Sequence, residues 1–170
     1  MVAIGECGLD YHRKENKKEQ KIIFLEHIRL SKETNKPLMI HCRDAFGDLI
    51  EILNDNRRFL IANNPGVLHF FTGTVEDAGK LSDLGFYFNF GGLITFNRSF
   101  DEVVKFIPLE KIMLETDAPY VAPASIRYKR NEPYYVSEIA QKLAEIKNIS
   151  FEEVCEKTTA NAVKNFNLTK

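Results

Sequence analysis

The sequence lacks an excess of charge of either sign. Lysine and arginine total 23 against 24 aspartate and glutamate residues, which gives a formal net charge of −1. Nucleic acid is held nonspecifically by bulk positive charge, and this chain has none. Any contact with a polyanion therefore has to be local.

The sequence also lacks long apolar runs, and we expect no secretory leader peptide. No run approaches the roughly 20 apolar residues of a membrane-spanning helix. No charged and then apolar segment with a small-residue cleavage site opens the chain. Because 170 residues suit one domain with a real core, we expect a single domain over 1–170, cytoplasmic and not inserted in a membrane.

Cysteine is scarce, which excludes a disulfide framework. The three cysteines form no C-x-x-C pair, and their number is odd, so reduced thiols are expected. Cys7 and Cys42 directly follow Glu6 and His41, which are candidate metal ligands. Consecutive side chains on a strand point to opposite faces, so we expect buried thiols here rather than thiolate ligands.

Short apolar runs alternate with longer amphipathic stretches from end to end, the pattern of βα repeats. Most runs lack strict alternation, as is typical of parallel strands buried on both faces. We therefore predict the α/β class, with five parallel strands in TIM-barrel-type βα repeats. The expected strands are 2–6, 37–42, 66–71, 86–90 and 111–117.

The stretches between and after these runs predict helices. Helical spacing of apolar residues or N-cap signals mark 15–35, 44–57, 74–85, 99–108, 133–147 and 150–166. Asp44, Thr74 and Ser99 are the expected N-caps. The segment 118–133, rich in proline and basic residues, is long for a simple connection, so we expect a further role for it.

Four metal-capable residues fall at or near the carboxyl ends of expected strands: Glu6, His41, His69 and Asp117. In a parallel α/β barrel these ends converge on one mouth, where active sites are found. One such residue alone is more often an ordinary polar side chain, but four at equivalent positions indicate a metal site. Histidine with carboxylate suits zinc, manganese or a similar divalent ion, and two ions can activate water and clamp a phosphoryl oxygen. The layout is typical of a hydrolase.

Five stretches resemble, in order and spacing, the hallmarks of the TatD family of metal-dependent deoxyribonucleases, within the amidohydrolase-like superfamily. They are GECGLDYHR, MIHCRDAF, LHFFTGT, ETDAPYVAP and KRNEP, and TTANAVKNFNL resembles the closing helix of the family. The resemblance covers essentially the whole chain. It implies a nuclease that uses Mg, Mn or Zn to cleave phosphodiester bonds of DNA as an exonuclease, on single-stranded DNA or 3′ ends.

The resemblance also implies roles for individual residues. Glu6 matches the glutamate that bridges two metal ions, and His41 and His69 match the histidines that complete one metal site. Asp117 matches the aspartate that contacts the other ion and its water, and is the expected catalytic base. Three further motif positions would support the ligands or the substrate phosphate, with a loop salt bridge as the alternative: Asp10, Arg43 and Asp44.

A phosphodiester substrate calls for local positive charge and for stacking surfaces. Five cations follow expected strands and could contact phosphates at the mouth: Arg13, Arg43, Arg127, Lys129 and Arg130. Four aromatic residues could stack on bases, although core packing is favoured for Phe71: Tyr11, Phe71, Tyr120 and Tyr128. Tyr128 stands where the family usually carries glycine.

One hallmark is absent. The first strand of the family carries an H-x-H pair that completes the second metal site, and no H-x-H occurs in this sequence. The chain thus resembles strands four to eight of the eight-stranded barrel. We expect one ion or none, with activity greatly reduced, and the alternatives are a non-catalytic metal- or nucleic-acid-binding remnant or another hydrolase of the superfamily acting on an amide or ester.

An incomplete barrel also predicts how the chain associates. Strands 2–6 and 111–117 would be exposed sheet edges, which invite pairing. We expect self-association or pairing with an N-terminal segment on a separate chain or lost from the reading frame. A partial barrel that stands alone is the remaining alternative.

Overall fold

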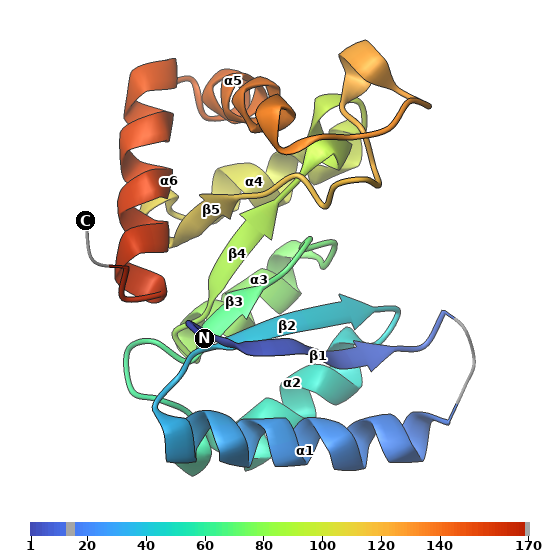
Figure 1. Ribbon diagram of the computed structural model, residues 1–170, viewed down its shortest axis with the longest axis vertical. Helices are drawn as coiled ribbons and strands as arrows, with labels where there is room; N and C mark the ends of the chain where they lie inside the picture. Colours follow the sequence, from blue (N-terminus) through green and yellow to red (C-terminus); the bar gives the residue numbers. More distant parts are fainter. Residues whose placement is uncertain (13–15, 169–170) are drawn as a thin grey trace.

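The structure, a computed structural model, describes residues 1–12 and 16–168 and contains one parallel sheet within them. Its strands pair in sequence order, β1-β2-β3-β4-β5, and the first and last are its edges, so the sheet is open (Figure 1). The strands are β1 (Ile4–Asp10), β2 (Leu38–Arg43), β3 (Gly66–Leu68), β4 (Tyr87–Phe90) and β5 (Ile112–Leu114). The predicted α/β class with five parallel strands is confirmed.

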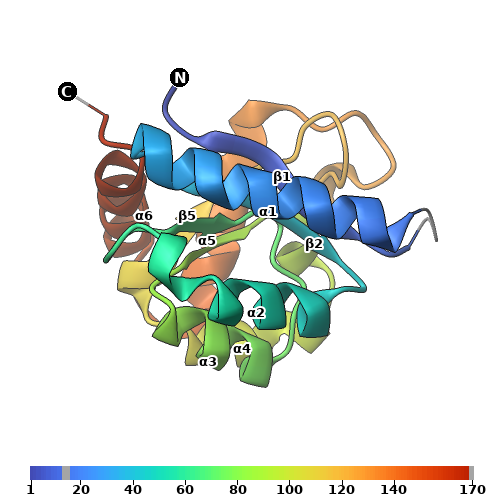
Figure 2. The ribbon, with the colours of Figure 1, turned by 90° about the horizontal axis from the view of Figure 1, so that it is seen from below.

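Four helices connect successive strands: α1 (Lys17–Thr34), α2 (Phe46–Asp55), α3 (Val75–Asp83) and α4 (Asp101–Phe106). In Figure 1, α1 runs along β1 while α2, α3 and α4 lie behind the strands, and Figure 2 shows these three on one side of the sheet. The main core lies between the sheet and all four of these helices, and its fully buried side chains include Phe24 of α1, Leu49, Leu81, Phe86 and Phe88.

Two further helices follow β5 and pack against the end of the sheet that β5 forms and against α4. α5 (Val136–Lys147) packs against α4 and α6, and α6 (Phe151–Asn165) packs against β5. A second, smaller apolar cluster forms where Phe166 and Ala162 meet the sheet residues Val67, Tyr87 and Met113. Within the described residues, no helix combines the length and the apolar character needed to cross a membrane.

The pleat of β2 decides which of its side chains face away from the core. Leu38, Ile40 and Cys42 are buried in the main core, whereas His41 and Arg43 between and after them are accessible. Successive side chains of a strand point to opposite faces, so His41 and Arg43 share the face turned away from the core helices.

The first strand is longer than predicted, and Glu6 does not end it. β1 starts at Ile4 rather than at residue 2 and continues to Asp10, because its pairing with β2 shifts between Ile4 and Cys7 and then resumes. The shift places one extra residue in β1, as in a β-bulge, which turns side chains that would otherwise face the core. Glu6 is exposed as a result, whereas Cys7 and Leu9 are buried.

Two of the three predicted N-caps are wrong. Thr74 caps α3 as expected, in a capping box with Asp77. Asp44 instead has a left-handed backbone (φ 55°), and α2 begins after Ala45 with no side-chain cap. Ser99 does not cap α4 either: its hydroxyl donates to the side chain of Asn97 at 2.8 Å, within the turn that precedes the helix.

Candidate metal centre

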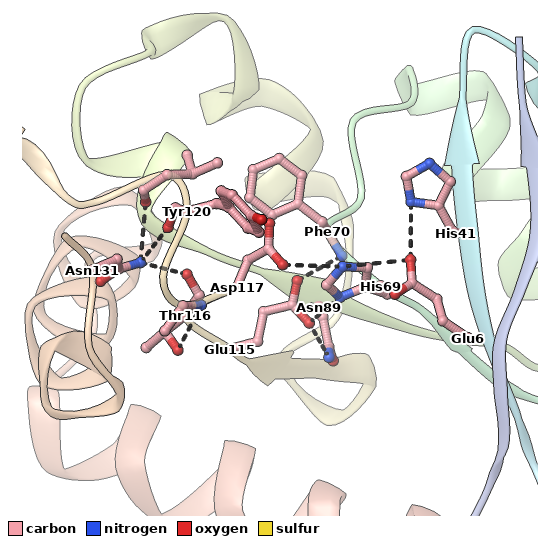
Figure 3. Close-up of polar contacts among 12 residues, drawn as sticks. Glu6, His41, His69, Phe70, Asn89, Glu115, Thr116, Asp117, Tyr120 and Asn131 are labelled. Carbon is pink, nitrogen blue, oxygen red and sulfur yellow. Dashed lines mark hydrogen bonds and ion pairs between the residues drawn. The ribbon is translucent and has the colours of Figure 1, made fainter. Parts of the chain in front are cut away.

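Three of the predicted ligands come together beside the first three strands: Glu6 lies within β1, His41 within β2, and His69 directly after β3. Glu6, His41 and His69 each offer one donor atom, and these atoms lie within 4.8 Å of one another. Glu6 Oε1 is 3.1 Å from His41 Nδ1 and 4.0 Å from His69 Nε2, as Figure 3 shows. The two imidazole rings stand 6.4 Å apart, centroid to centroid. This spacing leaves room for an ion among the three side chains.

Glu115 orients His69 and was missed by the sequence analysis. Its carboxylate accepts hydrogen bonds of 2.7 Å each from His69 Nδ1, from the backbone N–H of Phe70 and from Asn89 Nδ2 (Figure 3). A carboxylate only accepts, so Nδ1 of His69 carries the proton and Nε2 is left for a ligand. Metal-binding histidines are commonly fixed in this way by a carboxylate. The signal was available, because Glu115 stands two residues before Asp117 and side chains at that spacing on extended chain share a face.

His41 has a carboxylate at each ring nitrogen. Glu6 lies at Nδ1, and Asp10 Oδ2 lies 3.3 Å from Nε2. Asp10 also accepts the backbone N–H of His12 at 2.9 Å. Asp10 is therefore placed to support a ligand, whereas Asp44 pairs at 3.3 Å with the half-exposed His12, as in the alternative of a loop salt bridge.

Asp117 lies in the loop after β5 rather than at the end of that strand. β5 ends at Leu114, three residues earlier, and the backbone of Asp117 is left-handed (φ 54°). Its Oδ1 is 3.6 Å from His69 Nε2. Burial raises the pKa of the Asp117 carboxyl above its ordinary value; His69 opposes this rise, and Glu115 adds to it.

One cavity of about 680 Å³ is lined by Glu6, His41, His69, Asp10 and Asp117. Its wall also includes Arg43, Phe70 and Tyr120, the last 69% exposed. The other predicted phosphate contacts are not among its lining residues: Arg127, Lys129 and Arg130 are exposed on the 118–133 segment, and Arg13 lies outside the described residues.

The four aromatic residues proposed for base stacking differ in exposure. Tyr128 is 91% exposed with the Arg127 guanidinium 5.2 Å from its ring centre, and Tyr120 stands at the cavity wall. Phe71 is buried in the main core against Phe88, as favoured from the sequence. Tyr11 is half-buried, and its hydroxyl donates to Asp48.

The donor set fits a divalent cation. Imidazole nitrogen and carboxylate oxygen are ligands that zinc and manganese accept, and each histidine is held by a carboxylate outside the cluster. The neighbouring thiols of Cys7 and Cys42 do not contribute, since both are buried in the core and burial raises the pKa of each to about 12.

Divalent-ion affinity is expected to rise with pH through the pKa of His69. Burial alone would lower this pKa, but the hydrogen bond to Glu115 and the charges of Glu115, Glu6 and Asp117 outweigh it and raise the pKa above 6.5. A ligand histidine must be neutral. An ion bound at Nε2 therefore displaces the second proton of the imidazolium, the one on Nε2, while Nδ1 keeps its proton toward Glu115. Calorimetric titration with Mn²⁺ in buffers of different ionisation enthalpy should show proton release that is largest below the raised pKa.

The same proton acts on folding in the opposite sense. A raised folded-state pKa contributes stability that is fully present below the unfolded-state value and is lost as pH rises through the folded-state value. In EDTA, the His69 contribution to the free energy of unfolding should therefore shrink with rising pH.

The two measurements test His69 together. Ion affinity that does not change as the pH rises through the pKa of His69 would contradict the assignment of His69 as a ligand.

Comparison with known proteins agrees with this geometry. The family model described as TatD related DNase matches residues 1–167. A curated relative from Bacillus subtilis, "Uncharacterized metal-dependent hydrolase YabD", is 43% identical over 99% of this chain and 66% of its own length. A "Putative deoxyribonuclease TATDN1 homolog" from Enterocytozoon bieneusi is 36% identical over 98% of this chain and 61% of its own length.

A solved structure shows the same fold. The crystal structure of the TatD homolog YJJV from Escherichia coli K12 superposes with a TM-score of 0.91 at 27% identity, over 99% of this chain and 65% of that one. The chain thus spans less than two thirds of the length of these relatives. Because the family model matches nearly the whole chain, the protein belongs to the TatD-related DNase family.

Proposed function

We propose that this chain carries the metal-binding part of a divalent-metal-dependent hydrolase that cleaves phosphodiester bonds of DNA. The observation behind the proposal is the cluster of Glu6, His41 and His69, with His69 oriented by Glu115 and Asp117 beside it. The names of two relatives support both parts, since YabD is called a metal-dependent hydrolase and the TATDN1 homolog a putative deoxyribonuclease.

The residues divide the chemistry among them. Glu6, His41 and His69 would hold the ion through one carboxylate oxygen and two imidazole nitrogens. A divalent ion bound there supplies a Lewis acid for a phosphoryl oxygen and lowers the pKa of water. Asp117, whose pKa is raised by burial, is the base that takes the proton from the attacking water while the phosphorus–oxygen bond to the leaving group breaks.

The cavity wall supports a nucleic-acid substrate. Arg43 can pair with a phosphate through a charge-assisted hydrogen bond, and the exposed ring of Tyr120 can stack on a base, which is worth ~1–3 kcal/mol. Stacking needs an unpaired base, so single-stranded DNA or a 3′ end is the proposed substrate. Arg127, Lys129 and Arg130 would contact phosphates farther along the strand.

The proposal predicts that His41→Ala lowers Mn²⁺ affinity by at least about 100-fold, because it removes one of three donors. Calorimetric titration of the 170-residue chain measures this directly. His27→Ala is the matched control, since the Nδ1 of His27 contacts the Ile23 carbonyl of its own helix, and its affinity should equal that of the unchanged chain.

Cleavage is measured on the same proteins with a labelled single-stranded oligonucleotide and its duplex. Hydrolysis that requires Mn²⁺, stops with EDTA and is lost in His41→Ala supports the proposal. Ion binding without cleavage favours the non-catalytic alternative. Turnover of a p-nitrophenyl ester but of neither DNA contradicts the proposed substrate and favours the other hydrolase class.

A further inference from the structure

The segment 116–131, between β5 and the helical turn Pro133–Tyr135, forms a loop whose two ends meet. Its first part carries Asp117 and Tyr120, which line the cavity. Its second part carries Arg127 and Tyr128, both exposed. Its last residue, Asn131, reaches back to its first, as Figure 3 shows.

Asn131 is the buried contact between these ends. Asn131 is only 1% exposed. Its Nδ2 donates to the carbonyls of Thr116 at 2.6 Å, Tyr120 at 2.7 Å and Val121 at 3.3 Å. Its backbone N–H donates to Pro119 O at 3.1 Å. One side-chain amide thus holds carbonyls on both sides of Asp117 and Tyr120.

The held backbone is of a kind that needs support. Asp117 (φ 54°) and Val121 (φ 44°) both adopt positive φ, which is costly for a residue with a Cβ and most unusual for β-branched valine. Such conformations persist only where surrounding contacts over-determine them. The carbonyls that Asn131 binds, those of Thr116 and Tyr120, directly precede these two residues.

We propose that Asn131 is a positioning residue for the candidate site. Its amide fixes the strained backbone that aims Asp117 and Tyr120 into the cavity, and it closes the loop that presents Arg127 and Tyr128. The role in catalysis rests on the proposed function, but the fixing of the loop does not. The amide nitrogen of asparagine carries two N–H donors, so it can hold the carbonyls of Thr116 and Tyr120 at the same time.

The chain contains a matched control. The 116–131 loop follows the carboxyl end of β5, and a second buried asparagine, Asn161, contacts the chain where β5 begins. Asn161 is also buried (8% exposed), and its Nδ2 donates to the carbonyls of Leu109 at 2.8 Å and Ile112 at 2.7 Å. Ile112 is the first residue of β5 and Leu109 lies in the helical turn before it, and neither lines the cavity. Asn161→Ala therefore removes the same kind of contact without touching the site.

The experiment compares Asn131→Ala with Asn161→Ala. Hydrogen exchange followed by mass spectrometry should show roughly 10-fold or faster exchange across 116–131 in Asn131→Ala alone. Mn²⁺ affinity should fall roughly 10-fold in Asn131→Ala and stay unchanged in Asn161→Ala, although both variants lower the melting temperature. Asn131→Ser, which keeps one donor, should give an intermediate result and serves where the alanine variant folds poorly.

A double-mutant cycle separates positioning from general stability. Asp117 is not one of the three donors, but its carboxylate Oδ1 lies 3.6 Å from the donor atom Nε2 of His69, so its negative charge favours a cation in the cluster. If Asn131 acts through Asp117, adding Asn131→Ala to Asp117→Ala should cause little further loss of Mn²⁺ affinity, because the group being positioned is already gone. Additive losses, or equal exchange in 116–131 for the Asn131 and Asn161 variants, would overturn the proposal. Should the unchanged chain bind no Mn²⁺, the proposed function fails, while the exchange measurement still decides on Asn131.

Discussion

Replacing Glu115 by alanine is expected to lower Mn²⁺ affinity by roughly 100-fold and the free energy of unfolding by roughly 2–3 kcal/mol. The carboxylate is the common acceptor for His69 Nδ1, the Phe70 N–H and Asn89 Nδ2, at 2.7 Å each. Without it, the His69 ring loses its fixed orientation, and donors in the half-buried to buried interior lose their partner.

Two further variants make this result specific. Glu115→Gln keeps one acceptor oxygen but turns an N–H₂ group toward donors, so an intermediate loss of roughly 10-fold in affinity is expected. Asp101→Ala removes a carboxylate as little exposed as that of Glu115, which accepts from Arg98 Nε at 2.6 Å outside the cavity, and should leave affinity unchanged. Calorimetric titration and urea unfolding in EDTA give the two quantities separately. Unchanged affinity in Glu115→Ala would show that His69 needs no such support.

Gly8→Ala is expected to destabilise the protein by more than about 3 kcal/mol. Gly8 has φ +129°, and a Cβ built on it would lie 2.0 Å from the carbonyl oxygen of His41. That oxygen belongs to the backbone of β2, which pairs with β1 at this point, so it cannot move away without breaking the ladder. Because His41 is the residue displaced, the fraction that remains folded should also bind Mn²⁺ more weakly.

Gly47→Ala is the matched control. Gly47 lies in α2 with no atom within 4 Å of an added Cβ, and alanine is the better helix former by roughly 0.5–1 kcal/mol. Urea unfolding should therefore give a lower midpoint for Gly8→Ala and an equal or higher one for Gly47→Ala. A wild-type midpoint for Gly8→Ala would contradict the close approach of β1 and β2.

Sequence reasoning found the strands because periodicity is local, and it took their order from the resemblance to a barrel. Short apolar runs indicate parallel strands buried on both faces, and apolar residues repeating every 3.6 residues between these runs indicate helices. It placed the end of β1 at Glu6, whereas pairing with β2 continues to Asp10. A bulge adds one residue without changing composition, so nothing in the sequence marks it.

The candidate site was predictable where it depends on strand ends and hidden where it depends on loops. His41 and His69 follow from the convergence of carboxyl ends, whereas Glu6 was expected at a strand end but lies within β1, where the bulge exposes it. The bond from Glu115 to the Phe70 N–H joins residues 45 apart in sequence and depends on a positive φ at Phe70, which a single sequence does not reveal. Asn131 likewise stood within a recognised motif, but its partners 10 to 15 residues earlier are known only from the folded loop.

The pleat that buries Cys7 and Cys42 has a consequence for selectivity among ions. Each cysteine is the immediate neighbour of a candidate ligand, Glu6 or His41, yet its thiol lies in the core with a pKa raised to about 12. At neutral pH neither thiol offers a thiolate, the form in which cysteine binds metals. Thiophilic ions such as cadmium or mercury therefore gain no sulfur donor here, and the cluster competes for cations on nitrogen and oxygen alone.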